Sequence, residues 1–327
     1  MGPQPRVSVL ITSYQHERYI AQALDGVLEQ SPDVPFELLV GDDASTDGTR
    51  AIISEYAEAH PYTVRTCFPD RNLGLGGKAI FGELISRSRG EYIAMLDGDD
   101  YWNSPEKLQR QVAYMDEHPG SSMCFHNVLC RYDHESRSDH PYNSSDRAST
   151  LGMADVLDRF PMASCSPVFR REVLDPLPAW YFEMPWGDWP LYFMAAQHGA
   201  IHYLPDVMGV YRLHEHGMYA SLPRLKALEY RTTAYELLPV PPEHEDRRRR
   251  RLAETWVKRA LEHERLSERA AARGSLRRSF AVWPFQPRLG AAAETRRAAI
   301  WVLLRTPTAL ALNQHWAAWR HRRASRG

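Results

Sequence analysis

The chain has 327 residues, of which 43% are apolar and 25% charged, and its formal net charge at pH 7 is −1. This composition predicts a soluble globular protein and excludes a disordered or fibrous one. No apolar run is long enough to cross a bilayer, since the best stretch, residues 298–304, is followed at once by Arg305. The N-terminal residues lack a signal-peptide pattern and the four cysteines form no CxxC pair, so we expect a cytoplasmic protein with buried free thiols.

The near-zero net charge hides two oppositely charged parts. Residues 243–327 carry 20 Lys and Arg against 8 Asp and Glu, whereas residues 1–242 carry 20 against 33. Such a split indicates two units with different partners. We therefore expect a catalytic domain over residues 1–222 and a basic helical region over residues 223–327. The basic region shows no nucleic-acid motif, so nucleic acid is not expected as a partner.

Short apolar strands alternate with helix-period segments through the first 130 residues. Strands are predicted at residues 6–13, 36–43, 63–68, 91–96 and 121–128. Helices are predicted at residues 17–30, 47–60, 77–88 and 104–118, the last with Ser104 as its N-cap. This alternation predicts an α/β fold with a mostly parallel sheet flanked by helices. In such sheets ligands bind beyond the carboxyl ends of the strands.

The chain beyond residue 127 gives other patterns. Residues 127–160 are polar and irregular, which predicts a surface loop or lid. Residues 180–193 place seven aromatic residues around two acids, and residues 203–217 predict a further strand with a polar loop. From residue 223 onward the pattern is helical and rich in arginine.

Three carboxylates, Asp97, Asp99 and Asp100, directly follow the apolar strand at residues 91–96. Clustered carboxylates repel one another unless a cation, backbone donors or water offset the repulsion. Asp97 and Asp99 alternate along an extended segment, so both can approach one divalent cation, directly or through water. Hard oxygen ligands of this kind suit Mg²⁺ or Mn²⁺, with substrate phosphates completing the shell. The alternative is a capped turn in which Asp100 serves structurally.

A second acidic cluster, "GDDASTDG", ends the predicted strand at residues 36–43. A calcium-binding loop starting at Asp43 would need a glutamate at its twelfth position, where Ser54 stands, so this interpretation fails. As a strand-end loop, Asp42 and Asp43 can accept hydrogen bonds from a base edge or from ribose hydroxyls, and Asp47 can cap the next helix. The alternative for Asp43 is a turn-stabilising aspartate.

These segments together resemble a known family. "VSVLITSY", "VGDDASTDGT", "NLGLGGK", "GEYIAMLDGDD" and "YRLH", in this order and spacing, resemble the inverting glycosyltransferases of family 2, which have the GT-A fold. The resemblance covers residues 6–220. It implies that Asp97 and Asp99 form a DxD motif, whose metal bridges the phosphates of a nucleotide-sugar. It also implies that Asp43 binds a uracil ring, which Thr12 and Tyr14 meet at the end of the first strand.

Basic residues near the motifs are candidates for phosphate contact. The glycines of "NLGLGGK" let the backbone approach a ligand, although the segment lacks the spacing of a P-loop. Arg71 and Lys78 flank this loop as nucleotide contacts, and the alternative for both is a solvated surface position. The resemblance implies that the "YRLH" segment closes over the diphosphate. Arg212 or His214 would then neutralise it, and His214 would join the metal shell.

Asp188 is the candidate general base. Trp186 and Trp189 can stack on sugar faces and partly desolvate the carboxylate, which raises its pKa towards useful base strength. Trp102 is a further candidate for stacking on the sugar or acceptor. The family commonly shows a pair of acids at this site, and here Gly187 replaces the first. The alternative for Asp188 is an ordinary helix N-cap.

The sequence therefore predicts transfer of a sugar, hexosyl or N-acetylhexosaminyl, from a UDP-activated donor with inversion. Its acceptor would be a polysaccharide, a lipid-linked glycan or a natural product. One alternative is a nucleotidyltransferase, although the glycine-rich loop expected after the first strand is missing; another is a non-catalytic module that binds sugar nucleotides or glycans. The basic C-terminal region is a solvated appendage, a homodimer contact or a surface that rests on anionic lipid at the inner face of the membrane.

Overall fold

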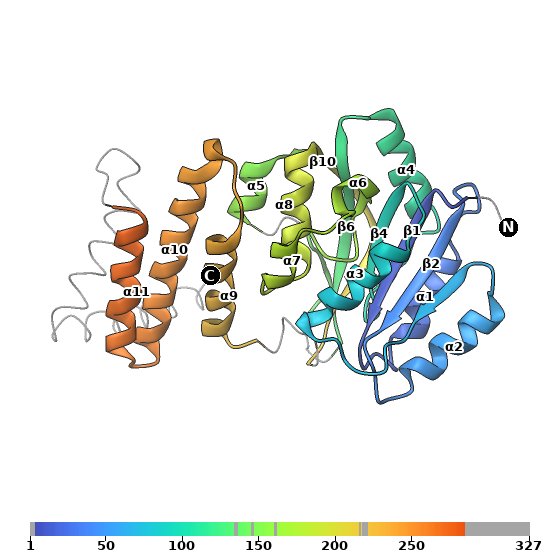
Figure 1. Cartoon of the computed structure of the whole chain (residues 1–327), viewed down its shortest axis with the longest axis horizontal. Coiled ribbons are helices and arrows are strands. Elements are labelled where there is room, and N and C mark those ends of the chain that lie inside the picture. Colours follow the sequence, from blue (N-terminus) through green and yellow to red (C-terminus); the bar gives the residue numbers. More distant parts are fainter. Residues whose placement is uncertain are drawn as a thin grey trace. The chain divides into compact units, whose positions relative to one another are not determined.

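The computed structural model describes residues 4–133, 137–144, 147–159, 162–215, 217 and 222–284. Its contacts divide the chain into two compact units, Met1–Ser221 and Leu222–Gly327 (Figure 1). The predicted Trp- and Arg-rich stretch at residues 298–327 lies outside the described residues.

A mixed sheet forms the centre of the N-terminal unit. Within the described residues it has ten strands in the order β3-β2-β1-β4-β9-β6-β10-β5, with β7 beside β6 and β8 beside β10. The strands are β1 Val7–Ser13, β2 Phe36–Asp42, β3 Val64–Cys67, β4 Tyr92–Asp97, β5 Tyr101–Trp102, β6 Ser121–Tyr132, β7 His140–Pro141, β8 Thr150–Leu151, β9 Val168–Arg170 and β10 Ala200–Leu213. Strands β1 to β4 pair in parallel, as do β6 and β10, whereas β9 runs antiparallel to its two neighbours.

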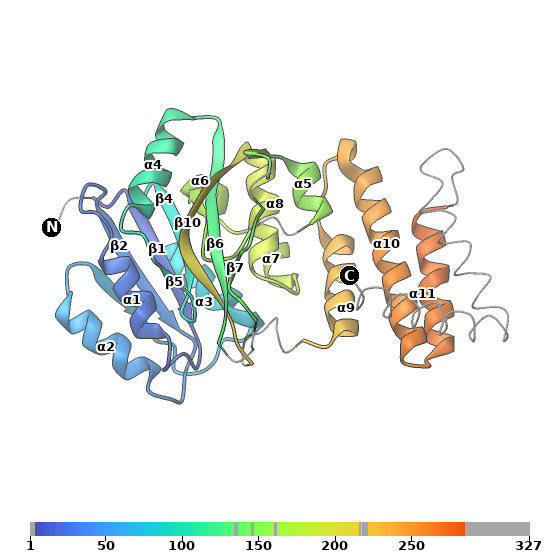
Figure 2. The same ribbon diagram turned by 180° about the vertical axis from the view of Figure 1, so that it is seen from behind.

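Helices cover both faces of this sheet. Helix α3 lies on the face that is turned towards the viewer in Figure 1, and α1 lies on the opposite face, seen in Figure 2. The helices of this unit are α1 Ile20–Leu28, α2 Thr49–Ala59, the 3-10 turn η1 Leu75–Gly77, α3 Lys78–Arg87, α4 Lys107–Glu117, α5 Met153–Asp158, α6 Arg171–Leu174, α7 Ala179–Glu183 and α8 Asp188–His198. The predicted α/β architecture is thereby confirmed.

The predicted apolar faces form the core. Ile20, Leu24 and Val27 of α1 are fully buried and pack with the apolar residues of β1 and β4. The helix predicted from residue 104 begins instead at Lys107, because a turn precedes it in which the Lys107 amide donates to the Ser104 carbonyl at 3.3 Å.

The prediction of a loop over residues 127–160 is wrong in large part. Strand β6 continues to Tyr132, and β7, β8 and α5 follow within the same stretch. The described residues between β6, β7 and β8 are largely exposed and irregular, as predicted, but the polar Asn127 lies buried within β6. Asn127 donates to the Asn143 carbonyl at 3.1 Å and accepts from the Asn143 amide at 2.9 Å. A buried polar side chain bonded in this way interrupts the alternating pattern without ending the strand.

The described part of the C-terminal unit is helical. It contains α9 Arg224–Leu237, the turn η2 Pro242–His244, α10 Glu245–Arg265 and α11 Arg269–Val282. Helix α10 packs against α9 and against α11, and with α11 it forms a small core that includes Val257, Ala260 and Leu276. None of the described helices is both long and apolar enough to cross a membrane. All four cysteines are free and buried, as predicted.

Candidate active site

The polar motifs meet where β1, β2, β4 and β10 end. The amide of Gly98, directly after β4, donates to the Thr12 carbonyl of β1 at 2.9 Å. The amide of Asp43, directly after β2, donates to the Ser13 carbonyl at 2.9 Å. The parallel pairing of β1 with both neighbours brings these ends to one edge of the sheet, as the sequence predicted.

Asp97 is held by two hydroxyl groups. The Thr12 hydroxyl donates to Oδ1 at 3.0 Å, and the Ser164 hydroxyl donates to Oδ2 at 2.6 Å. Burial and the nearby charge of Asp99 raise the pKa of Asp97. Since each carboxylate oxygen has two lone pairs, both oxygens retain room for a further contact. Thr12, predicted to meet the nucleotide, therefore also fixes the first acid of the DxD motif.

Asp99 lies between two imidazoles. Its Oδ2 is 3.1 Å from His214 Nε2 and 3.8 Å from His16 Nε2. Burial opposes ionisation of Asp99, but the hydrogen bond from His214 and the charges of both imidazoles lower its pKa overall. His214 was predicted here. His16 was not, although it follows the predicted Tyr14 by only two residues.

Gly98 makes room for His16. A Cβ atom on Gly98 would lie 2.8 Å from His16 Nδ1, 3.0 Å from Ile20 Cδ1 and 3.1 Å from Ser13 Oγ. Real Cβ atoms essentially never approach another heavy atom to 2.8 Å, so a larger residue would displace the imidazole. The glycine between Asp97 and Asp99 is therefore favoured by its close packing against the loop after β1.

Asp100 joins the acidic motif to β10. Its Oδ1 accepts the Arg212 amide at 2.8 Å, and the Arg212 guanidinium donates to the Asp99 carbonyl at 2.6 Å. The same guanidinium lies over the rings of Tyr19 and Tyr101, 5.0 Å and 4.6 Å from their centroids. Asp100 thus serves structurally, as the alternative interpretation held, and the predicted Arg212 adjoins the acidic motif.

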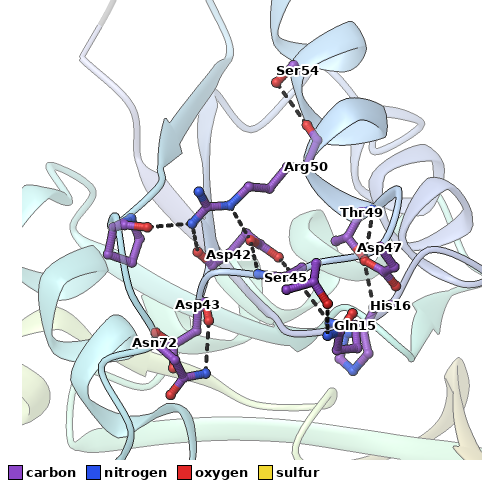
Figure 3. Close-up of polar contacts among 12 residues, drawn as sticks. Gln15, His16, Asp42, Asp43, Ser45, Asp47, Thr49, Arg50, Ser54 and Asn72 are labelled. Carbon is purple, nitrogen blue, oxygen red and sulfur yellow. Dashed lines mark hydrogen bonds and ion pairs between the residues drawn. The ribbon is translucent and has the colours of Figure 1, made fainter.

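The loop after β2 is organised around Asp42, as Figure 3 shows. Asp42 is fully buried, and its Oδ1 accepts from Arg50 Nε at 2.6 Å and from the Ser45 amide at 2.9 Å. The Asp47 carboxylate accepts from the Thr49 amide at 3.1 Å at the start of α2, in line with the predicted capping role. Asp42 is therefore committed to the loop itself.

Asp43 is the acid of this loop whose carboxylate keeps one oxygen available to a ligand. Its Oδ1 accepts the Leu73 amide at 2.7 Å, and its carbonyl accepts from the Asn72 side chain at 2.9 Å. Among the hydrogen bonds of the described residues, none reaches Oδ2 of Asp43. Tyr14 is 48% exposed, so its ring has a face for a base, and Arg71 is exposed as well.

Lys78 does not occupy the phosphate position predicted for it. Its side chain is buried, and Nζ donates to the carbonyl oxygen of Met184. Burial lowers the pKa of Lys78. The lysine is thus attached to the segment that precedes the candidate base, because the first turn of α3 faces this segment instead of open solvent.

Asp188 begins α8 and accepts the Trp189 amide on Oδ1 at 2.8 Å. Burial raises its pKa from 3.8 to about 6, and the charge of Asp97 adds to this shift. Burial raises the pKa of Tyr181 and that of Tyr192, and the charges of Asp188 and Asp97 raise both further. The candidate base and the DxD motif therefore lie within electrostatic range of each other.

The prediction that three tryptophans stack on sugars is corrected by their burial. Trp102, Trp186 and Trp189 are only 3%, 5% and 1% exposed. Trp102 Nε1 donates to the Cys165 carbonyl at 2.8 Å, and Trp189 Nε1 donates to the Val156 carbonyl at 2.9 Å. These rings pack in the core beneath the site. The sequence shows that tryptophans are abundant here, but it does not show that they are buried.

The residues fit a divalent ion only in part. Across the described portion of the chain, no group of three His, Cys, Asp or Glu side chains could hold a metal by itself. Asp99 and His214 nevertheless offer one carboxylate and one imidazole, donors that Mn²⁺ accepts, with Asp97 beside them. Such a site needs phosphate oxygens from a substrate to complete its shell.

Comparison with known proteins identifies the family to which the chain belongs. The model of glycosyl transferase family 2 matches residues 8–177, just over half of the chain. The uncharacterized protein Rv1520 of Mycobacterium tuberculosis is 38% identical over 216 residues, 66% of this chain and 61% of the relative. The chain thus spans about three fifths of the length of that relative.

Two solved structures share the fold. TarS 1-349 of S. aureus in complex with UDP-GlcNAc has a TM-score of 0.61 at 19% identity, covering 85% of this chain and 82% of that one. The mannosyltransferase PcManGT of Pyrobaculum calidifontis, in complex with GDP-Man and Mn²⁺, has a TM-score of 0.57 at 20% identity, covering 97% and 83%. The fold is accordingly of the GT-A type, with a helical C-terminal region, and by its family match the chain belongs to glycosyl transferase family 2.

Proposed function

We propose that this glycosyltransferase transfers a sugar from a UDP-activated donor to an acceptor nucleophile with inversion, and that Asp188 is the general base. One observation carries the proposal: Asp188 is half-buried, its environment raises its pKa to about 6, and the charge of Asp97 adds to this shift. A base of this strength is half-ionised near pH 6 and mostly ionised at neutral pH, so it can take a proton from a hydroxyl group. Because Asp188 lies near Asp97, it would remove the proton of the acceptor close to the bound donor.

The donor nucleotide would be held by the loops after β1 and β2. Asp43 has an oxygen available for the polar edge of uracil, and the half-exposed ring of Tyr14 offers a stacking surface. Arg71, exposed on the loop that bonds Asp43, is proposed to contact the nucleotide. The UDP-GlcNAc bound to TarS supports a UDP donor, whereas the GDP-Man of PcManGT makes GDP-sugars the comparison to exclude.

A divalent ion, Mn²⁺ or Mg²⁺, would be held by Asp99 and His214, with Asp97 contributing directly or through water. When bound, it would neutralise the diphosphate and stabilise the charge of the leaving group. Arg212 adds a permanent positive charge beside Asp99. His16 and His214 hold the Asp99 carboxylate from either side, so it is preorganised for this role.

Asp188 would remove the proton of the acceptor while the acceptor attacks the anomeric carbon opposite the departing diphosphate. Such a single displacement inverts the configuration at that carbon. The Trp189 amide donates to Oδ1, which leaves the other carboxylate oxygen to face the acceptor. The polysaccharide, lipid-linked glycan or natural product that accepts the sugar is not specified by these residues.

Replacement of Asp188 by asparagine tests the proposal. Titration calorimetry with UDP-GlcNAc, UDP-glucose and GDP-mannose, each with and without MnCl₂, gives the donor class. Transfer of labelled sugar to a cell-envelope extract gives activity. We expect Asp188→Asn to bind the UDP-sugar within threefold of wild type and to lose transfer by about 10²–10⁴-fold. Asp206→Asn, an exposed aspartate paired with Arg110, is the matched control.

Four outcomes contradict parts of the proposal. Full transfer by Asp188→Asn would exclude Asp188 as the general base, whereas donor binding without transfer by wild type would favour the non-catalytic interpretation. Metal-dependent binding of GDP-mannose in preference to both UDP-sugars would replace the uracil assignment of Asp43 and Tyr14. Equal binding with and without MnCl₂ would remove the metal role of Asp99 and His214.

A further inference from the structure

Helices α3 and α7 lie side by side in the N-terminal unit (Figures 1 and 2). Gly82 in the middle of α3 permits this approach, because a Cβ atom there would lie 3.1 Å from Phe182 Cζ and 3.2 Å from Cε1 of the same ring. Residues four apart share one face of a helix, so Lys78 projects from the same side of α3 as Gly82. That side faces the segment that leads into Asp188.

Lys78 makes the polar contact of this interface. Its side chain is only 4% exposed, and its ammonium group donates to the Met184 carbonyl in the connection between α7 and α8. Its aliphatic stem contacts the same connection, since a Cβ on Gly187 would lie 3.4 Å from Lys78 Cγ. Burying an ammonium group is unfavourable unless it is hydrogen-bonded, so this bond is the one that justifies a lysine here.

The residues before Lys78 lead directly to the nucleotide subsite. Gly74, Leu75, Gly76 and Gly77 all have positive φ, of 73°, 58°, 59° and 81°. Directly before them, the Leu73 amide donates to the Asp43 carboxylate at 2.7 Å. A left-handed conformation at a leucine is strained, and such strain is kept only where the surrounding structure fixes the loop. The loop therefore joins Asp43 at one end to Lys78 at the other.

We propose that Lys78 is a positioning residue that ties the donor side of the site to the segment bearing the candidate base. The connection runs from Asp43 through Leu73 and the glycine loop to Lys78, and from there through the Met184 carbonyl to Asp188. Nucleotide held at Asp43 then stiffens the loop, and the loop holds residues 184–188 in place. This inference rests on the proposed function for the roles of Asp43 and Asp188, but the physical link itself does not.

Amide hydrogen exchange of the full-length protein tests that link without an activity assay. Lys78→Met keeps most of the aliphatic stem and removes the donor, and Lys226→Met is the same change at a half-exposed lysine of α9. We expect exchange over residues 184–190 to be at least tenfold faster in Lys78→Met than in wild type. Strand β2 should stay within twofold, and Lys226→Met should match wild type throughout. Lys78→Arg, which retains donors, should restore most of the protection.

Unchanged exchange at residues 184–190 in Lys78→Met would overturn the proposal. So would equal acceleration in β2, because the lysine would then support the fold as a whole.

A second measurement separates positioning from phosphate contact. UDP with MnCl₂ should slow exchange at residues 184–190 in wild type but not in Lys78→Met, while the dissociation constant for UDP changes less than threefold. A tenfold weaker affinity for UDP in Lys78→Met would make the lysine a phosphate ligand and overturn the proposal. If wild type fails to bind UDP, the proposed donor is wrong, and the comparison without nucleotide still decides the role of Lys78.

Discussion

His214 Nε2 lies 3.1 Å from Oδ2 of Asp99, although 115 residues separate the two in the chain. His214 follows β10 and Asp99 follows β4, and these strands are not neighbours in the sheet. The hydrogen bond from the Arg212 amide to the Asp100 carboxylate brings the end of β10 across to the acidic motif. Asp99 is consequently fixed from two directions, by His214 and by His16 of the loop after β1.

Gly98→Ala tests how far catalysis depends on this arrangement. The added Cβ would meet His16 Nδ1 at 2.8 Å and push the imidazole away from Asp99. We expect the affinity for Mn²⁺ in the presence of UDP to fall at least tenfold and stability to fall by about 1–3 kcal/mol, as for other overpacked sites. Calorimetry and urea denaturation measure the two effects.

Gly120→Ala is the control for this prediction, since a Cβ on Gly120 would meet nothing within 4 Å. It should leave ion affinity and stability unchanged. Equal ion affinity in Gly98→Ala and wild type would show that His16 plays no part in holding Asp99.

The pH dependence of transfer should report Asp188. Burial raises the pKa of Asp188 to about 6, and a general base works only in its deprotonated form. We expect kcat/KM to rise about tenfold between pH 5 and pH 7 and then to level off, because the ionised fraction rises in that ratio. Asp206→Asn should keep this profile. A profile that is flat from pH 5 upward would exclude Asp188 as the base.

Local patterns predicted the parallel half of the sheet because each strand and helix there is long enough to show its own period. The strands at β1, β2, β3 and β4 all lie where apolar runs indicated them. Strand β9 has three residues and β5 has two, too few for any period to emerge. Their positions are fixed by pairing with β4, β6 and β10, which no local pattern contains.

The residues of the candidate site likewise divide into those that the local sequence could assign and those that it could not. Asp43, Asp99 and His214 follow strand ends and Arg212 is the last but one residue of β10, and strand ends could be read from the sequence. Lys78 could not be assigned correctly, because its contact is a backbone carbonyl 106 residues away, and a backbone group leaves no trace in the sequence. The tryptophans were misassigned for a related reason, since an indole in the core and an indole in a sugar site look alike in a sequence.

Asp188→Asn should also stabilise the protein, and the gain should depend on pH. With a pKa raised from 3.8 to about 6, folded Asp188 keeps a proton that the unfolded chain releases between about pH 4 and pH 6. The stability that this proton contributes is present below pH 4 and lost as the pH rises through 6. Asparagine has no such loss, so we expect the variant to be about 1–3 kcal/mol more stable at pH 7.5 and equal to wild type at pH 4.

Urea denaturation of both proteins at the two pH values measures this difference. A variant that is less stable than wild type at pH 7.5 would mean that the Asp188 carboxylate is stabilised by partners in the folded state. It would then be a structural residue, as in the helix-capping alternative.

Arg50→Met should destabilise the nucleotide-binding loop and, with it, the fold. Asp42 is fully buried, and Arg50 Nε pairs with its carboxylate at 2.6 Å. Removal of one partner leaves a buried charge uncompensated, which typically costs about 3–5 kcal/mol. Since 31% of the Arg50 side chain is exposed, water offsets part of this, and we expect a loss of about 2–3 kcal/mol in urea denaturation. Arg87→Met, which breaks an exposed pair with Glu83, should lose less than about 0.5 kcal/mol. Equal losses in the two variants would mean that the Ser45 bonds alone hold Asp42 and that the arginine is dispensable to the loop.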